Sequence, residues 1–246
     1  MNLLETKGLT KSFGGLTAVN NVNFQVASGE LRAVIGPNGA GKTTFFNLIA
    51  GRLPSTRGEI WFKGENITHI PPHHVTKKGI GRSYQVTNIF PKLTVFENVR
   101  LAAQAVATTF TFWKDAMSMH ELNGRVLEIL EKLKMAEQKD ARAANLSHGL
   151  QRHLEIGIAL ACHPELLLLD EPTAGMTEEE TEHMMELINE ISKDVTIVLV
   201  EHDMKFVMTL AKKITVLHEG KVLAEGPPEA IRNNEDVQRV YLGKKK

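Results

Sequence analysis

The residues from Gly36 to Thr44 carry the clearest chemical pattern in the chain. They read Gly-Pro-Asn-Gly-Ala-Gly-Lys-Thr-Thr, the phosphate-binding pattern of two spaced glycines followed by lysine and a hydroxyl residue. Glycines let the backbone turn its N–H groups toward one centre, and the dipole of a following helix points its positive end there. Lys42 could reach the outer phosphates of a nucleotide, and Thr43 could ligate Mg²⁺.

The segments on either side supply the setting that this pattern needs. Residues 31–35 are continuously apolar, which is typical of a buried strand, and residues 45–50 are expected to be helical. A glycine turn before an ordinary helix is the alternative, but the strand–loop–helix order favours a phosphate site. The residues expected to bind nucleotide here are Asn38, Gly39, Ala40, Gly41, Lys42, Thr43 and Thr44.

Two acidic residues end a second apolar run. Asp170 and Glu171 follow residues 166–169, and ligand sites in parallel sheets lie outside the carboxyl ends of strands. Because the phosphate loop also follows its own strand, both features are expected at one edge of the sheet. We assign Asp170 to Mg²⁺ and Glu171 to the orientation and polarisation of an attacking water. Two acids exposed at a strand end are the alternative, which the upstream phosphate loop disfavours.

His202 and Gln85 are further candidates at this edge. His202 closes the predicted strand 195–200, directly after Glu201, and could hydrogen-bond a γ-phosphate. An isolated histidine is usually structural, so its position at the sheet edge carries this hypothesis. Gln85 follows a predicted strand at 81–84 and could reach Mg²⁺ or the water.

Strands alternate with helices along most of the chain, which predicts a largely parallel, helix-covered sheet. Residues 3–35 are rich in strand patterns, and another short strand is expected at 58–64. Strand-like runs are scarce between about 71 and 150, so we predict a mostly helical insert of roughly 60 residues within this range. Its features are a capping box at Thr94–Glu97, a loop at 107–112 and an apolar helical face over 122–133.

A second α/β half is expected after Leu146. Ser147 can cap a helix, and Thr177 with Glu180 forms a capping box for the next one. The remaining expected elements are the buried strands 166–169 and 195–200, a hairpin over 214–224, and closing helices at 230–233 and 237–242.

Composition limits the classes of function. The 246 residues carry 29 basic and 29 acidic side chains, so charge gives no reason to expect a nucleic-acid partner. Cys162 is the single cysteine, which excludes an intrachain disulfide and fits a reducing compartment. The first residues show no secretion-signal pattern, and no apolar run approaches the ~18 residues of a membrane span.

In order along the chain, these motifs resemble those of the ATP-binding-cassette (ABC) ATPases over nearly the whole sequence. In that family an aromatic residue ahead of the phosphate loop stacks on adenine, and Phe13 matches it. The glutamine loop matches at Gln85 and the switch histidine at His202. The signature motif, usually Leu-Ser-Gly-Gly-Gln, matches residues 146–150, and the second acidic motif matches residues 166–171.

The resemblance implies an α/β fold of the P-loop NTPase class, formed as one ABC ATPase domain over residues 1–246. Residues 1–90 and 150–246 are expected to form a RecA-like catalytic core with an antiparallel β subdomain. Residues from about 91 to 149 are expected to form a helical subdomain. The expected cofactors are ATP and Mg²⁺, and Val19 is expected to join Phe13 in the nucleotide site.

The family also implies a partner for the site. Two cassettes pair head to tail, and the phosphate loop of one faces the signature motif of the other. Ser147, His148 and Gly149 are therefore expected to complete the site of a second cassette. This sequence departs from the usual motif at His148 and Leu150, which replace glycine and glutamine. It also has Thr177 where many members have aspartate, so the sequence does not decide whether the two nucleotide sites communicate through this loop.

Several stretches resemble cassettes that serve importers of branched-chain amino acids: 79–85, 89–99, 200–204 and 240–243. Residues 174–177 and 216–220 resemble urea and short-amide importers, and lipopolysaccharide-export cassettes are similar too. The implied partners are membrane permeases docking near residues 89–91, a second cassette, identical or different, and a solute-binding protein outside the membrane. The chain would lie on the cytoplasmic face of the membrane. No nucleic-acid partner is expected.

Two rival classes follow from other uses of these motifs. A switch GTPase would need a guanine-reading Asn-Lys-x-Asp motif, which the sequence lacks. A cassette ATPase acting on ribosomes or DNA usually carries two cassettes or a long coiled-coil insertion. This chain has one cassette and a modest insert, which favours transport.

Overall fold

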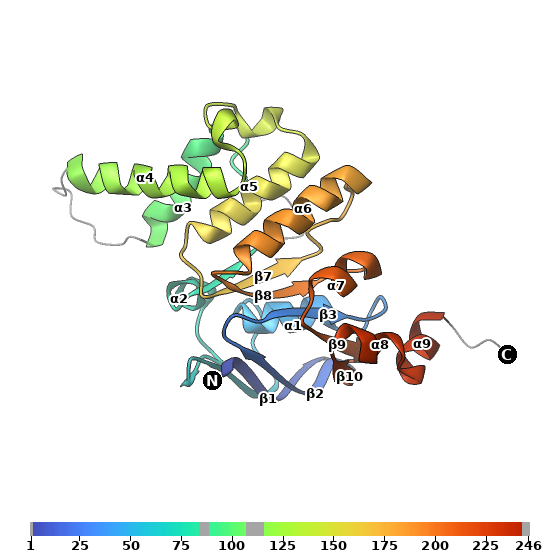
Figure 1. Cartoon of the computed structure of the whole chain (residues 1–246). Coiled ribbons are helices and arrows are strands. Elements are labelled where there is room, and N and C mark those ends of the chain that lie inside the picture. Colours follow the sequence, from blue (N-terminus) through green and yellow to red (C-terminus); the bar gives the residue numbers. More distant parts are fainter. Residues whose placement is uncertain (1, 84–88, 107–115, 243–246) are drawn as a thin grey trace.

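A computed structural model gives the fold and describes residues 2–83, 89–106 and 116–242. A six-stranded sheet lies at the centre of the molecule (Figure 1). Its strands, in spatial order, are β10 (Lys221–Gly226), β9 (Lys213–His218), β3 (Leu31–Ile35), β8 (Thr196–Val200), β7 (Leu166–Asp170) and β6 (Ile80–Arg82).

The direction of these strands gathers the candidate residues at one edge of the sheet. The strands from β9 to β6 run parallel, and β10 pairs antiparallel with β9 at one side. Val34 and Asp170 both pair with Val200 in the sheet register. The carboxyl ends of β3, β7 and β8 therefore meet at one edge, as the sequence predicts, and the loops that follow them lie together.

Helices cover the sheet (Figure 1). In chain order the helices of the described residues are α1 (Lys42–Ile49), α2 (Pro72–Lys77), α3 (Val95–Val106), α4 (Ala116–Lys132), α5 (His148–Leu160), α6 (Glu178–Ile191), α7 (Met204–Leu210), α8 (Pro228–Arg232) and α9 (Glu235–Leu242). Of these, α3 and α4 lie beyond α5, away from the sheet (Figure 1). Short 3-10 turns at Ala136–Gln138 and Ala143–Asn145 lie between α4 and α5. Within the described ranges, no helix has the length and apolar character needed to cross a membrane.

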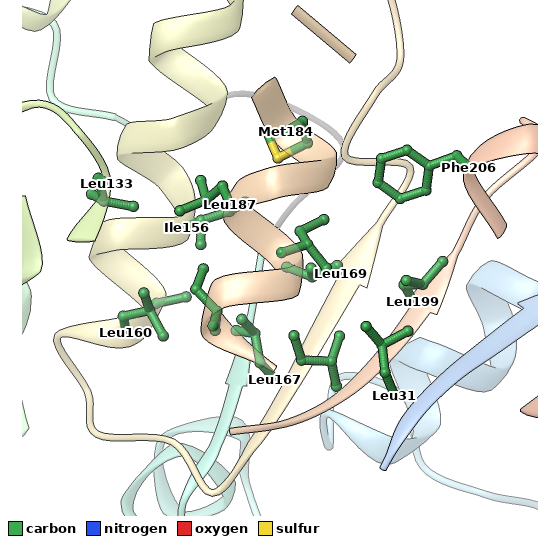
Figure 2. Packing of buried hydrophobic residues seen from close by; sticks show 14 of the residues in the cluster. Leu31, Leu133, Ile156, Leu160, Leu167, Leu169, Met184, Leu187, Leu199 and Phe206 are labelled. Atoms are coloured by element: carbon green, nitrogen blue, oxygen red, sulfur yellow. The ribbon is translucent and has the colours of Figure 1, made fainter. Parts of the chain in front are cut away.

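Strand β7 explains why the central strands are apolar at every position. Leu167 and Leu169 belong to the core under α5 and α6, whereas Leu166 and Leu168 belong to the core on the α1 side. Successive side chains of a strand point to opposite faces, so a strand covered on both faces needs apolar residues throughout. Figure 2 shows Leu167 and Leu169 beneath Leu187 of α6.

A second, antiparallel sheet packs against the α1 side. Its strands, in spatial order, are β2 (Leu16–Ala27), β1 (Asn2–Phe13), β4 (Arg57–Phe62) and β5 (Glu65–Asn66). Strand β4 ends two residues before the predicted boundary, because Lys63 and Gly64 take positive φ values of 53° and 78° and turn the chain into β5. The antiparallel β subdomain of the expected fold is therefore present.

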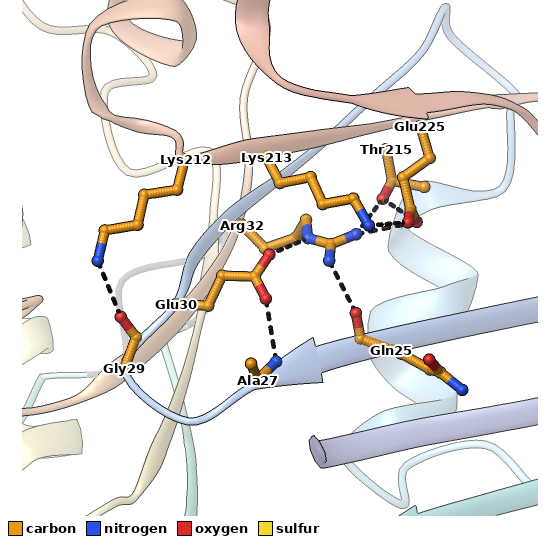
Figure 3. Close-up of polar contacts among 9 residues, drawn as sticks. All are labelled: Gln25, Ala27, Gly29, Glu30, Arg32, Lys212, Lys213, Thr215 and Glu225. Atoms are coloured by element: carbon orange, nitrogen blue, oxygen red, sulfur yellow. Dashed lines mark hydrogen bonds and ion pairs between the residues drawn. The ribbon is translucent and has the colours of Figure 1, made fainter. Parts of the chain in front are cut away.

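Arg32 ties the two sheets together (Figure 3). This fully buried residue of β3 donates from Nη2 to the Gln25 carbonyl oxygen at 2.8 Å and from Nε to Glu30 Oε1 at 2.6 Å. Its Nη1 contacts Thr215 Oγ1 at 3.0 Å and Glu225 Oε2 at 2.9 Å, on β9 and β10. A buried guanidinium is tolerated when it is paired and hydrogen-bonded, and this one holds β3 against β9 and β10 of its own sheet and β2 of the other.

Helix starts follow the capping residues that the sequence shows. Thr94 and Glu97 exchange backbone-to-side-chain hydrogen bonds at 3.1 and 2.8 Å ahead of α3. Thr177 and Glu180 form a complete capping box at α6, and Ser147 caps α5. Helix α9 begins two residues earlier than predicted, because Asn234 Oδ1 accepts from the Val237 amide at 3.0 Å and opens it ahead of the apolar pattern.

The predicted insert contains α3, α4 and the two 3-10 turns. Helix α5 packs against it closely: a Cβ at Gly157 would lie 2.4 Å from Leu133 Cδ1. Ion pairs from Lys132 to Asp194 and from Lys134 to Glu186 join the end of α4 to α6 and the turn after it. The predicted loop at 107–112 falls outside the described residues. The boundaries at 91 and 149 stay predictions.

Candidate nucleotide site

Two glycines of the phosphate loop are required by the close approach of neighbouring backbone. Gly41 has φ +100°, and a Cβ there would lie 2.2 Å from the Ala18 carbonyl oxygen. A Cβ at Gly36 would lie 2.2 Å from the carbonyl oxygen of Leu217. No side chain fits at either position without moving backbone, so the glycine spacing seen in the sequence reflects how the loop packs on β2 and β9.

Lys42 is the first residue of α1 and lies almost wholly buried against the loop. Its Nζ donates to the Gly36 carbonyl oxygen at 2.7 Å and to the Pro37 carbonyl oxygen at 3.0 Å. Burial lowers the pKa of Lys42 from its ordinary value, and the charges of Glu171 and Asp170 oppose that shift. The ammonium thus lies between the loop and the two candidate acids, where it can meet a phosphate.

The rest of the loop offers backbone and hydroxyl groups. Asn38 and Gly39 are exposed, Ala40 is buried, and the Thr43 side chain is exposed in the first turn of α1. The Phe45 amide begins the helical hydrogen bonding by donating to the Gly41 carbonyl oxygen at 2.8 Å. The amides ahead of it lie at the positive end of the helix dipole, which suits a phosphate.

Asp170 is fully buried at the end of β7 and forms an ion pair with Arg82 of β6. Arg82 Nη2 lies 3.0 Å from Asp170 Oδ2, and Nη1 donates to Asn47 Oδ1 at 2.7 Å. Burial raises the pKa of Asp170, while Arg82 and Lys42 act to lower it. The second oxygen, Oδ1, is buried and accepts no hydrogen bond from the described residues. One carboxylate oxygen is thus fixed and the other is left for a ligand.

Glu171 and His202 meet at the same edge. Glu171 has a positive φ of 51°, and its amide donates to the Val200 carbonyl oxygen at 2.9 Å. Its Oε1 lies 2.7 Å from His202 Nε2. Positive φ in a non-glycine residue is costly and is held here by the strand end. The carboxylate and imidazole, predicted from separate strands, are adjacent in the folded chain.

Glu201 has a role that sequence reasoning missed. It is buried, and its Oε1 accepts from the Thr173 amide at 2.9 Å and from the Thr173 hydroxyl at 2.5 Å. Its Oε2 accepts from the His202 amide at 2.8 Å. Glu201 therefore links the loop after β7 to the loop after β8. An acid directly before a candidate histidine, at the end of an apolar strand, was the available signal.

Two residues predicted to lie in the nucleotide site differ in exposure. Phe13, at the end of β1, is 47% exposed, with Lys11 Nζ 5.0 Å from its ring centroid. Val19 is fully buried and packs in the core on the α1 side. Gln85 falls outside the described residues. Phe13, Val19 and Gln85 thus stay predictions.

The signature stretch lies on a separate helix from the phosphate loop. Ser147 and His148 are exposed, Gly149 is buried, and Ser147 Oγ accepts from the Leu150 amide at 3.3 Å. Within the described part of the chain, no hydrogen bond or ion pair joins residues 147–149 to residues 36–44. The chain by itself brings together the loop, the two acids and His202, but not the signature stretch.

The family follows from sequence matches over most of this architecture. Residues 19–174 match the ABC transporter family. Residues 221–246 match branched-chain amino acid ATP-binding cassette transporters. LivG of Escherichia coli K12, a high-affinity branched-chain amino acid transport ATP-binding protein, is 41% identical over 98% of each chain.

The chain belongs to the ABC transporter family.

Solved ABC cassettes have the same fold. The ADP conformation of MJ1267, an ATP-binding cassette of an ABC transporter, matches with a TM-score of 0.87 and 28% identity, covering 99% of this chain and 100% of that one. A dimeric, post-hydrolysis state of the cassette MJ0796 bound to ADP and Pi matches with a TM-score of 0.78 and 29% identity, over 92% and 98%. The predicted family and fold class, with its ABC ATPase domain, are confirmed, and cassettes of this fold bind nucleotide and form dimers.

The Arg82–Asp170 pair of this ABC cassette gives a stability prediction. Arg82→Met leaves the Asp170 carboxylate buried without its partner, and we expect the free energy of unfolding to fall by about 3–5 kcal/mol at neutral pH. Loss of Arg82 raises the pKa of Asp170 further. The Asp170 carboxyl then binds a proton more tightly in the folded chain than in the unfolded chain. The loss of unfolding free energy in Arg82→Met therefore becomes smaller as the pH falls below this raised pKa. Urea unfolding at two pH values measures this, and a pH-independent deficit would contradict it.

Proposed function

We propose that this chain is the ATP-hydrolysing subunit of an importer for branched-chain amino acids. The similarity to LivG over 98% of both chains is the observation that carries the substrate class. The match of residues 221–246 to branched-chain cassettes supports it independently, because that segment lies outside the ATPase core match at 19–174. The cassette itself touches no transported solute, so kinship is the source of this assignment.

The roles of individual residues follow from the geometry. Lys42 and the loop amides hold the phosphates. Glu171 accepts a proton from the attacking water while the water oxygen bonds to the γ-phosphorus, and the bond from that phosphorus to the bridging oxygen breaks, so that ADP and phosphate leave. His202, 2.7 Å from Glu171, orients that carboxylate and contacts the γ-phosphate. Catalysis of this kind is mostly positioning and stabilisation of charge on the transferring group.

The residues around Asp170 fit a magnesium ion. Asp170 Oδ1 is a buried carboxylate oxygen with no protein hydrogen bond in the described ranges, and Thr43 offers an exposed hydroxyl on the helix that follows the loop. Oxygen ligands of this type are those that Mg²⁺ prefers. When bound, the ion neutralises charge on the β- and γ-phosphates. Thr43, Asp170 and Gln85 are the proposed ligands, directly or through water.

A second cassette completes the site in this proposal. Ser147 and Gly149 of one chain contact the γ-phosphate held by the other chain, with His148 between them. The dimeric MJ0796 cassette supports pairing, and the second cassette is either a copy of this chain or a related one. ATP binding closes the pair, the closure moves the permeases, and hydrolysis lets the cassettes part.

The assembled system would include membrane permeases and a solute-binding protein. A short permease helix would dock beside the helical insert, near residues 89–91, and hold the cassette on the cytoplasmic face of the membrane. Ile89 is partly buried and packs against the main core, while Phe90 is 52% exposed. An exposed aromatic ring at the start of the insert suits a contact with an apolar helix.

Uptake measurements test the substrate class. Cells lacking this chain should lose uptake of radiolabelled leucine, isoleucine and valine and regain it with the wild-type chain but not with Lys42→Ala. Urea and acetamide uptake and the export of lipopolysaccharide should be unaffected. Intact leucine uptake together with a loss of one of the other activities would overturn the assignment.

A further inference from the structure

The N-termini of α5 and α6 lie against each other at the signature stretch. Thr177 Oγ1 accepts from the Glu180 amide at 3.2 Å, and Glu180 Oε2 accepts from the Thr177 amide at 3.0 Å. This capping box uses one oxygen of the Glu180 carboxylate. The other oxygen faces Gly149: a Cβ built there would lie 2.7 Å from Glu180 Oε1 and 2.9 Å from Cδ.

The carboxylate therefore also interacts with the α5 terminus. Hydrogen bonding to the Thr177 amide, first, and to the Gly149 amide lowers the pKa of Glu180 below its ordinary value. The charge of His148 acts in the same direction, and its ring approaches the loop before α6, with Cε1 3.5 Å from a Cβ built at Gly175. The Glu180 carboxylate thus lies beside the first turn of a 13-residue helix, at the positive end of its dipole.

The same amide is the one that a second cassette's nucleotide needs in the proposed function. A backbone amide has one hydrogen to donate, and a carboxylate beside it repels an incoming phosphate. We propose that Glu180 competes with the γ-phosphate for Gly149, so that closure of the cassette pair requires Glu180 to turn away from α5. The proposal rests on the proposed contact between the signature stretch and the second cassette's ATP.

The capping box makes such a turn feasible without unfolding α6. Oε2 keeps its bond to the Thr177 amide when Oε1 leaves Gly149, because only the outer torsions of the glutamate need to change. Glu180 is then a positioning residue: it holds the signature stretch while the cassettes are apart and sets the ATP concentration at which they close.

Glu180→Gln tests this, because glutamine suits the third position of a capping box but carries no charge. In the assembled transporter we expect the ATP concentration for half-maximal turnover to fall about three- to tenfold, with maximal turnover changed little, since hydrogen bonds to charged groups are the stronger ones. The difference should shrink as salt rises. Glu179→Gln removes the same charge from the same turn and should leave the half-saturating ATP concentration near the wild-type value.

Equal shifts in the two variants, or a higher half-saturating ATP concentration in Glu180→Gln, would overturn the inference. Ser147→Arg separates this from a failure of the proposed function, since a large cation there blocks the signature contact. Full turnover in Ser147→Arg would refute the contact with the second cassette. Loss of turnover in Ser147→Arg, together with equal shifts of the half-saturating ATP concentration in Glu179→Gln and Glu180→Gln, would refute only the competition between Glu180 and the γ-phosphate. The proposed contact with the second cassette would stand.

Discussion

Glu171→Gln should bind ATP as tightly as the wild-type chain and hydrolyse it about 10²–10⁴ times more slowly, the range typical of a lost general base. Glutamine has nearly the shape of glutamate, and its oxygen can still face His202 Nε2, which lies 2.7 Å from Glu171 Oε1. The amide cannot take a proton from water. The hydrogen bond that the backbone N–H of residue 171 donates to the Val200 carbonyl oxygen is unaffected, so the strained turn is retained.

The rate of phosphate release measures hydrolysis, and the affinity for a fluorescent ATP analogue measures binding, so the two together show whether only hydrolysis is lost. Glu165→Gln is a matched control, because Glu165 lies just before the amino end of β7 while Glu171 follows its carboxyl end. Its carboxylate pairs with Lys63 at 2.5 Å and is half exposed, and such pairs contribute little. Turnover in Glu171→Gln within about threefold of the wild-type rate would remove Glu171 from the role of general base.

The parts of the site that the sequence predicted are those set by local rules. Glycine spacing located the phosphate loop because backbone contacts at Gly36 and Gly41 exclude any side chain. Continuous apolar runs located β3, β7 and β8 because both faces of these strands are covered. The parallel-sheet rule then placed Asp170 and the phosphate loop at one edge, and the register agrees.

The contacts that the sequence did not predict join elements far apart in the chain. Arg82 meets Asp170 because β6 adds beside β7, and neither residue pattern indicates strand order. The sequence indicated Glu180 only as part of the capping box of α6. Its contact with Gly149 depends on how α5 and α6 pack against each other. The burial of Val19 does not follow from strand alternation, because Val19 is out of phase with the buried residues Val22, Phe24 and Val26 of the same strand.

Lys42→Ala should weaken ATP binding about 10–100-fold and abolish turnover, since a lost hydrogen bond to a charged group costs about 1.5–3 kcal/mol. The fold should not suffer. Burial lowers the pKa of Lys42, so at neutral pH the folded chain holds this proton less tightly than the unfolded chain. The free energy of unfolding of the wild-type chain therefore rises with pH between the lowered pKa of Lys42 in the folded chain and the ordinary pKa of lysine in the unfolded chain. Removing the ammonium removes that unfavourable burial, and the free energy of unfolding should be equal or higher.

Nucleotide titration and urea unfolding on the same protein check both halves of this expectation. Lys212→Ala is the matched control, since Lys212 Nζ also donates to a backbone carbonyl oxygen, that of Gly29 at 3.2 Å, but at the opposite end of β3. It should leave ATP binding unchanged. The pH dependence adds a second test: wild-type affinity should begin to fall at a lower pH than an exposed lysine would allow, because only the charged ammonium attracts the phosphates. If Lys42→Ala lost stability and affinity together, the lysine would be holding the loop rather than the nucleotide.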